Sequence, residues 1–290
     1  MKRALGIAAA VCALAGAGFA VAGLTATKVV NIRSTGFVPK AVTVAVLDTV
    51  QWKNTDTATH QVVANSGAFA SGAILPGRSY SKRLDTPGNY PYHDALKPTL
   101  KGTVRVTGAP PSVSIAASLP IAVFGSQIHL TGAISPAAVG DNVALFAQPY
   151  GQASFVKMND VQTTTNGVWD VITPPQILTA YKATWKGKTS AVIQVQVAPK
   201  LTLIRSSGWF VTRAQAPKSF SGHWVYLQRQ NRFGEWVSLK KIVLNRQSAK
   251  RFKVRNLPRG VSRLRTFMTT NQAGVGYVFG TSPVLSFRRR

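Results

Sequence analysis

Histidines and paired carboxylates carry much of enzyme chemistry, and this chain is poor in both. It holds four histidines, His60, His93, His129 and His223, and eight acidic residues among 290. None of these histidines lies near a G-x-S-x-G nucleophile signature, and the chain has neither a G-x-G-x-x-G nor a P-loop motif. Scattered acids are also a poor basis for a catalytic carboxylate pair. We therefore predict that the protein is not an enzyme, and we infer no small-molecule substrate.

Two of the histidines stand in segments that form a recognisable pattern. His60 begins the run His60-Gln61-Val62-Val63, and His93 lies within Tyr92-His93-Asp94-Ala95-Leu96-Lys97-Pro98-Thr99-Leu100-Lys101-Gly102. Upstream of both come Phe37-Val38-Pro39 and Asp48-Thr49-Val50-Gln51-Trp52-Lys53-Asn54. With these motifs, residues 28–107 resemble the cupredoxin family, in particular its plastocyanin- and amicyanin-like branch. The resemblance implies a Greek-key β-sandwich with a copper site.

The resemblance also implies where copper ligands belong. The family loop reads Y-H-C-x-x-H-x-x-M-x-G after a more distant first histidine, so the implied positions here are His60, Asp94, Lys97 and Leu100. A blue-copper site needs a thiolate and two imidazoles with a weak axial thioether. Only His60 is of the required type, and the Lys97 ammonium would repel a cation. His93 should point to the opposite side of its strand from Asp94.

We therefore predict a vestigial site with no metal and no other cofactor. In this interpretation Asp94 and Lys97 form an ion pair that fills the pocket, and His60 hydrogen-bonds to it. The alternative is a copper-binding electron-transfer protein of the plastocyanin type. Copper is a cofactor only under that alternative, which rests on fold resemblance rather than on the site residues.

The elements that must position these residues are predicted to be β-strands throughout. After residue 27, short runs alternate apolar and polar residues and end at turn-forming residues, as in Thr103-Val104-Arg105-Val106. Linkers near residues 108–111 and 198–200 divide the chain into units 23–110, 111–199 and 200–290. The predicted fold class is all-β, with a cupredoxin-like Greek-key sandwich followed by two further β-sandwiches.

The second and third units look like copies of one plan. Gly140-Asp141-Asn142-Val143-Ala144-Leu145 parallels Gly222-His223-Trp224-Val225-Tyr226-Leu227, and Ser190-Ala191-Val192 parallels Ser282-Pro283-Val284. In this tandem pattern they resemble the immunoglobulin-like domains of bacterial surface and secreted proteins. We expect two immunoglobulin-like sandwiches, with Trp209, Phe210, Trp224 and Trp236 in the core of the second rather than available for stacking.

The N-terminus has the form of a secretory signal peptide. Lys2 and Arg3 precede an uncharged apolar run, and Ala20-Val21-Ala22 fits an A-x-A cleavage site. We assign residues 1–22 to a Sec-type signal cleaved after Ala22; an uncleaved membrane anchor is the alternative. The only cysteine, Cys12, lies inside it. The protein is thus expected to be secreted or associated with the cell envelope.

The positive charge gathers at the other end of the chain. Formal net charge is +27, and residues 200–290 supply nineteen Lys or Arg against one acid, Glu235. We expect two adjacent antiparallel strands here to display a basic stripe that binds anions. Its candidate residues are Arg251, Lys253, Arg255, Arg259, Arg263 and Arg265.

These features predict a non-catalytic binding or structural protein whose last unit presents a cationic face to an anionic polymer. Envelope polymers and lipid headgroups are the candidate partners, and nucleic acid would be bound without sequence specificity. A subunit of a surface layer or filament, which would self-assemble, is a further alternative. The simplest alternative is that the basic face binds nothing and only keeps the protein soluble.

Overall fold

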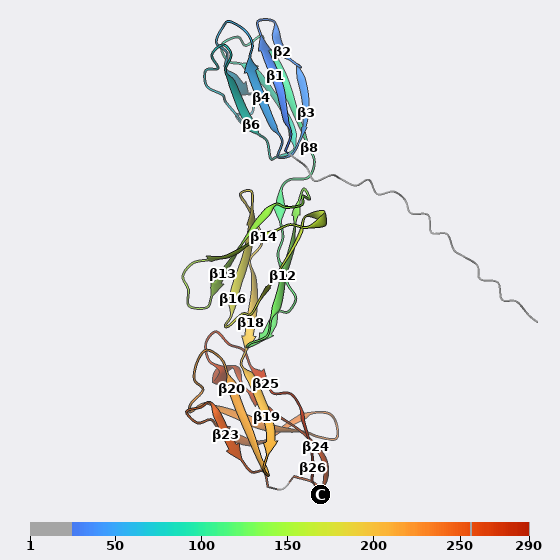
Figure 1. Ribbon diagram of the computed structural model, residues 1–290, viewed down its shortest axis with the longest axis vertical. Helices are drawn as coiled ribbons and strands as arrows, with labels where there is room; N and C mark the ends of the chain where they lie inside the picture. Colours follow the sequence, from blue (N-terminus) through green and yellow to red (C-terminus); the bar gives the residue numbers. More distant parts are fainter. Residues whose placement is uncertain (1–24, 256, 290) are drawn as a thin grey trace, which may run out of the picture.

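Three β-sandwich units follow one another along the chain. The computed structural model describes residues 25–255 and 257–289, so the predicted signal segment lies outside the described residues. Each unit has its own buried cluster of apolar side chains, and the units lie end to end (Figure 1). The all-β prediction is confirmed: the described elements are strands except for η1 (Thr165–Gly167) and α1 (Thr270–Ala273). No helix in the described ranges is long and apolar enough to cross a membrane.

The first unit is a sandwich of two four-stranded sheets. One has the order β2-β1-β4-β6 and the other β3-β8-β7-β5. The pairs β1/β4 and β3/β8 are parallel, so the chain crosses between the sheets instead of forming only hairpins. The strands are β1 (Thr27–Arg33), β2 (Gly36–Val38), β3 (Ala41–Ala45), β4 (Thr49–Asn54), β5 (Val62–Ala64), β6 (Ser79–Arg83), β7 (Gly88–Asp94) and β8 (Lys101–Thr107).

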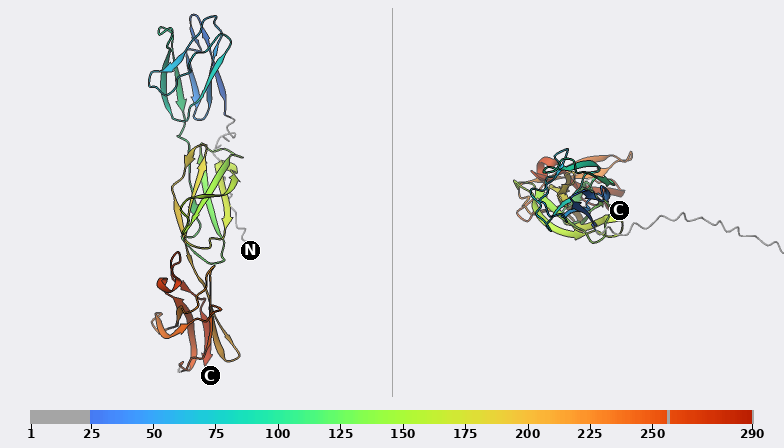
Figure 2. Two further views of the ribbon diagram at one scale, coloured as in Figure 1. Left: turned by 90° about the vertical axis from the view of Figure 1, so that its left-hand side faces the viewer. Right: turned by 90° about the horizontal axis from the view of Figure 1, so that it is seen from above.

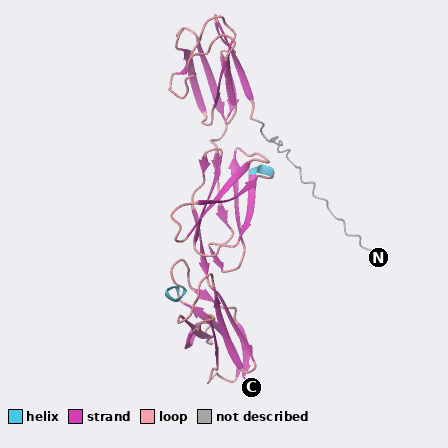
Figure 3. Cartoon of the chain, turned by 60° about the vertical axis from the view of Figure 1, so that its left-hand side comes forward, coloured by secondary structure: helices cyan, strands magenta, loops and turns pink. Residues whose placement is uncertain are grey.

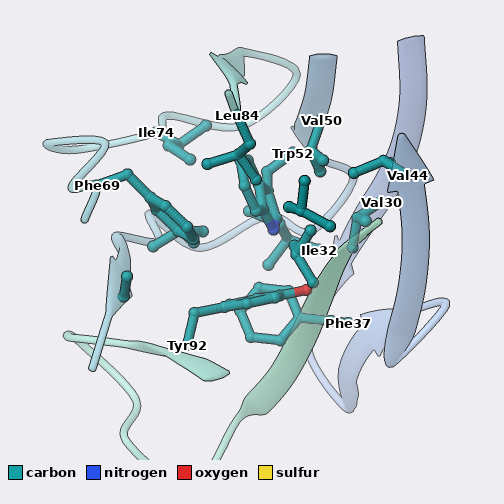
Figure 4. Packing of buried hydrophobic residues seen from close by; sticks show 14 of the residues in the cluster. Val30, Ile32, Phe37, Val44, Val50, Trp52, Phe69, Ile74, Leu84 and Tyr92 are labelled. Atoms are coloured by element: carbon teal, nitrogen blue, oxygen red, sulfur yellow. The ribbon is translucent and has the colours of Figure 1, made fainter. Parts of the chain in front are cut away.

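Aromatic rings fill the core of this unit. Trp52 of β4 and Tyr92 of β7 are fully buried and meet edge to face, with ring centroids 5.4 Å apart (Figure 4). Phe37 packs on the Tyr92 ring from the β2 side. A Cβ on Gly102 would come within 2.4 Å of Tyr92, so β8 can pass this ring only with glycine there. The alternating burial of β4 and β7 thus fixes which side chains face inward.

The second and third units each pair a smaller sheet with a larger one. The second has β10-β12-β15, with β9 beside β12, and β11-β18-β16-β13-β14, with β17 beside β16. Its strands are β9 (Ser112–Val113), β10 (Ala116–Ala117), β11 (Ile121–Val123), β12 (Ile128–Ser135), β13 (Asn142–Pro149), β14 (Val156–Gln162), β15 (Val168–Thr173), β16 (Thr179–Trp185), β17 (Lys188–Thr189) and β18 (Ile193–Ala198).

The third unit has β19-β20-β23 facing β22-β21-β24-β25, with β26 also paired to β24. Its strands are β19 (Lys200–Ser206), β20 (Trp209–Gln215), β21 (Trp224–Gln230), β22 (Trp236–Val243), β23 (Ala249–Phe252), β24 (Gly260–Met268), β25 (Gly280–Thr281) and β26 (Leu285–Arg289). The run β14-β13-β16 of the second unit therefore corresponds to β22-β21-β24 here.

The two units share details finer than strand order. The pairing of β13 with β14 shifts register between Leu145 and Phe146. The pairing of β21 with β22 shifts at the corresponding place, between Leu227 and Gln228. Ser190 Oγ accepts a 2.9 Å hydrogen bond from the Ala183 amide, and Ser282 Oγ accepts one of the same length from the Thr266 amide. Each of the two serines also donates to the carbonyl of the next residue. These shared features support the tandem repeat inferred from the sequence.

Side chains join the units where they meet. Leu47, between β3 and β4, is buried in the core of the second unit, and Lys188 Nζ lies 3.0 Å from Asp85 Oδ2. At the next junction Ile177 packs against the third core, and the Leu178 amide donates to the Gly276 carbonyl. Two further views show the resulting elongated arrangement (Figures 2 and 3).

Candidate functional site

The positions implied for copper ligands converge at one end of the first sandwich. His60 forms an isolated bridge with Ile74 just before β5, and Asp94 ends β7 opposite Val62. Both side chains are buried, with Asp94 fully shielded and His60 2% exposed. Leu100, at the end of the loop, is buried in the apolar core. The pairing of β5 with β7 therefore brings His60 to Asp94, and the Asp94 amide donates to the Leu100 carbonyl.

Asp94 is held by three donors. His60 Nδ1 lies 2.6 Å from Asp94 Oδ2, and the amides of Gln61 and Leu96 donate to Oδ1 at 2.8 and 3.1 Å. Burial alone raises the pKa of Asp94. The His60 hydrogen bond and the two amide bonds outweigh it, so the pKa of Asp94 lies below its usual value. The carboxylate is therefore stable in its charged form despite being buried.

The second nitrogen of His60 is also occupied. Nε2 lies 3.1 Å from Asp56 Oδ2. The amide of Thr57, and after it the His60 contact, lower the pKa of Asp56. Both ring nitrogens of His60 are therefore already engaged by carboxylates, which leaves no unoccupied imidazole nitrogen for a metal.

The predicted ion pair between Asp94 and Lys97 is wrong. Lys97 is exposed, and its Nζ donates to the Ser34 carbonyl at 2.8 Å. Asp94 pairs with His60 instead, because the inward face at the end of β7 opposes His60, whereas the loop carries Lys97 out to solvent. His93 projects away from Asp94 and hydrogen-bonds to Asn65 Oδ1 at 2.7 Å.

The donor set does not fit copper. The four positions supply one imidazole, one carboxylate, one ammonium and one alkyl group, and the imidazole is already held by two carboxylates. Nowhere in residues 25–255 and 257–289 do three His, Cys, Asp or Glu side chains gather in a way that could hold a metal ion. What this site can do is join β7 to the segment preceding β5 through buried hydrogen bonds.

The second candidate site is a pair of hollows in the third unit. The larger, of about 810 Å³, is lined by side chains of β20, β21, β22 and β23 and of the segment after β23. Its lining residues are Trp209, Arg229, Leu239, Lys240, Lys250, Arg251, Phe252, Lys253, Val254, Arg255 and Leu257. It therefore spans the gap between the edge strands of the two facing sheets, and six of its residues are cationic.

The predicted basic stripe on two paired strands is wrong. β23 pairs with β20 and β24 pairs with β21, so the two segments belong to opposite sheets. β23 and β24 therefore do not pair as a hairpin. Of the six predicted residues, Arg251, Lys253 and Arg255 line the hollow, while Arg259, Arg263 and Arg265 do not.

Tryptophan rings support several of these cations. Arg251 and Lys253 both lie 4.6 Å from the centre of the Trp209 ring. Lys241 lies over Trp224 and Arg265 over Trp236, at 3.7 and 4.1 Å. Arg265 also donates to Gln228, and burial lowers its pKa. All three tryptophans are half-buried, so the prediction that they form the core is wrong; only Phe210 of that set is buried.

Sequence reasoning missed five cations of the hollows, Arg205, Arg229, Lys240, Lys250 and Arg289. Lys240 and Lys250 are ten residues apart and come from opposite sheets. Nothing in the local alternation pattern identifies them, because their proximity depends on how the sheets face each other. The weak signal available was the overall cation excess of this unit.

Comparison with known proteins reaches only part of the chain. No family model and no curated protein matches it. Among solved structures, a purple cupredoxin from Nitrosopumilus maritimus is 22% identical and covers 27% of this chain and 98% of its own, with a TM-score of 0.26. The Cu(I) form of an amicyanin mutant is 30% identical and covers 29% of this chain and 83% of its own, with a TM-score of 0.27.

A copper-containing nitrite reductase from Thermus scotoductus SA-01 is 25% identical and covers 30% of this chain and 23% of its own, with a TM-score of 0.27. Each of these matches covers less than a third of the chain. The β-sandwich prediction for the first unit is confirmed by its two four-stranded sheets.

Proposed function

We propose that this is a non-catalytic binding protein of the cell envelope or exterior, whose third unit holds an anionic polymer. The observation that carries the proposal is the larger hollow, where Arg251 and Lys253 lie against Trp209 among four further cations. None of the ion pairs within the described ranges involves the third unit. In the part of the chain that the structure describes, no carboxylate pairs with these cations, and an anion would relieve their repulsion.

The first two units act in this proposal as a support. The first is a cupredoxin-like unit that has lost its copper ligands and binds no cofactor, because Asp94 and Asp56 occupy the imidazole of His60. The second and third are immunoglobulin-like domains, a view supported by their shared register shifts and serine hydrogen bonds. Residues 1–22 direct export in this proposal. If the mass of the exported protein equals that of a chain that starts at Gly23, cleavage after Ala22 is supported.

Retention of the purified protein on a polyanionic column tests the binding proposal. Arg251→Ala, Lys253→Ala and Arg255→Ala together should lower the salt concentration of elution, since each lost contact reduces the slope of log K against log[salt] by about 0.7–0.9. The control removes the same charge outside the hollows, with Arg213→Ala, Arg246→Ala and Arg263→Ala. Equal effects of the two sets, or no retention of the parent protein, would contradict the proposal.

A further inference from the structure

A second hollow lies beside the larger one. The second, of about 500 Å³, is lined by Arg205, Gly208, Phe210, Lys253, Val254, Arg255, Leu257, Phe287 and Arg289. Four residues, Lys253, Val254, Arg255 and Leu257, line both. Because the same four side chains line both hollows, the two hollows lie next to each other. Arg289 lies at the end of β26, next to the C-terminus, which is at the far end of the molecule from the first unit (Figure 1).

Together, the linings of the two hollows contain eight cationic side chains and no acidic one. The larger contributes Arg229, Lys240, Lys250 and Arg251, the smaller Arg205 and Arg289, and Lys253 and Arg255 belong to both. Arg229 Nε is buried and has no hydrogen-bond partner in the described part of the chain. Such an extended row suits an anion with many charges in succession better than a single small ion.

The aromatic rings that line the hollows are either covered by cations or buried. Trp209 lies under Arg251 and Lys253, and Arg205 lies 4.8 Å from the centre of the Phe287 ring. Phe210 is buried in the core. Single-stranded nucleic acids are held largely by stacking bases on open aromatic faces. These rings instead hold cations in place, so the surface offers charge without stacking platforms.

We propose that the two hollows form one continuous track that binds a linear polyanion without aromatic bases, such as a polymer of sugar or polyol phosphates. This rests on the proposed function and adds the shape and chemical class of the ligand. Two neighbouring recessed hollows suit a flexible chain, whereas a flat lipid surface or a stiff duplex fits recessed sites poorly. Arg205 and Arg289 extend the site beyond the residues needed for short anions.

Inorganic polyphosphate is a base-free probe of this track. Calorimetric titration should show tripolyphosphate binding in the larger hollow and long-chain polyphosphate engaging both. Arg205→Gln with Arg289→Gln should leave tripolyphosphate affinity within about twofold. The same pair of substitutions should reduce the slope of log K against log[salt] for long-chain polyphosphate by about 1.4. This corresponds to a loss of affinity of roughly 25-fold at ~0.1 M salt. The matched control is Arg213→Gln with Arg246→Gln, which lie outside both hollows.

The outcomes separate the two proposals. If the parent protein binds neither polyphosphate, the proposed function fails. If it binds both but the second-hollow pair weakens long-chain binding no more than the control pair, the continuous track is wrong and the larger hollow alone remains. If oligo(dT) of equal charge binds more tightly than polyphosphate, the bases contribute and the base-free ligand class is wrong.

Discussion

Removal of the Asp94 carboxylate should destabilise the first unit far more than removal of an exposed carboxylate does. Asp94→Ala leaves three donors, His60 Nδ1 and the amides of Gln61 and Leu96, without their acceptor in a buried site. Each buried unsatisfied donor costs about 1–3 kcal/mol, and breaking a buried charged pair about 3–5 kcal/mol in all. These contributions overlap, so we expect a loss of about 4 kcal/mol from the free energy of unfolding of this unit.

The protein contains a matched control. Asp170 contacts His129 Nδ1 at 2.9 Å, but both side chains are about half exposed. Asp170→Ala should cost about 0–1 kcal/mol, since exposed ion pairs contribute little. The loss of unfolding free energy for Asp94→Asn should lie between those of the two alanine variants. Its amide oxygen still accepts from the backbone, but the charge beside His60 is lost.

Scanning calorimetry of the full chain measures this difference. For a unit of this size 1 kcal/mol moves the midpoint by ~4–8 °C, so Asp94→Ala should lower one transition by at least about 15 °C. Hydrogen exchange in β4 and β7 identifies that transition as the first unit's. A shift for Asp94→Ala no larger than for Asp170→Ala would refute the assignment of Asp94 and His60 as a buried structural pair.

Four further results are expected. Because the folded-state pKa of Asp94 is lowered, its contribution to stability is present above the unfolded value of about 3.9 and is lost as pH falls through the folded pKa; acid titration of the first-unit midpoint should show this loss, and a pH-independent midpoint would contradict it. One equivalent of Cu(II) should give no intense blue absorption; a blue protein would overturn the loss of the copper site. Leu47→Ala should cost about 2–4 kcal/mol at the first junction, seen as faster proteolysis near residues 108–111; unchanged cleavage would count against a packed junction. Gly276→Ala should loosen the second junction, because its Cβ would lie 2.6 Å from Ile177, and scattering should show a broader range of overall dimensions; an unchanged scattering curve would show that Ile177 yields without cost.

The alternation of apolar and polar residues was enough to predict strands and an all-β fold. Side chains on a strand alternate between faces, and the burial of β4 and β7 alternates accordingly, with Trp52 and Tyr92 facing inward. The repeat of the last two units was also visible as parallel motifs, and Ser190 and Ser282 of these motifs make equivalent hydrogen bonds in the structure. The positions of His60 and Asp94 and the hydrogen bond of His60 in this pocket followed from the motif resemblance, but the departure of Lys97 from the pocket did not.

By itself, the sequence determined the strands, the cation excess of the last unit and the absence of a copper-type ligand set at the four implied positions. Only the tertiary structure decided that Lys97 takes no part in the pocket of His60 and Asp94, and that the basic residues on either side of Phe252 and Gly260 belong to opposite sheets. The physical reason is the range of the interactions. Strand formation and net charge depend on neighbouring residues, whereas a buried pair or a groove depends on which distant strands pair and how their sheets face each other.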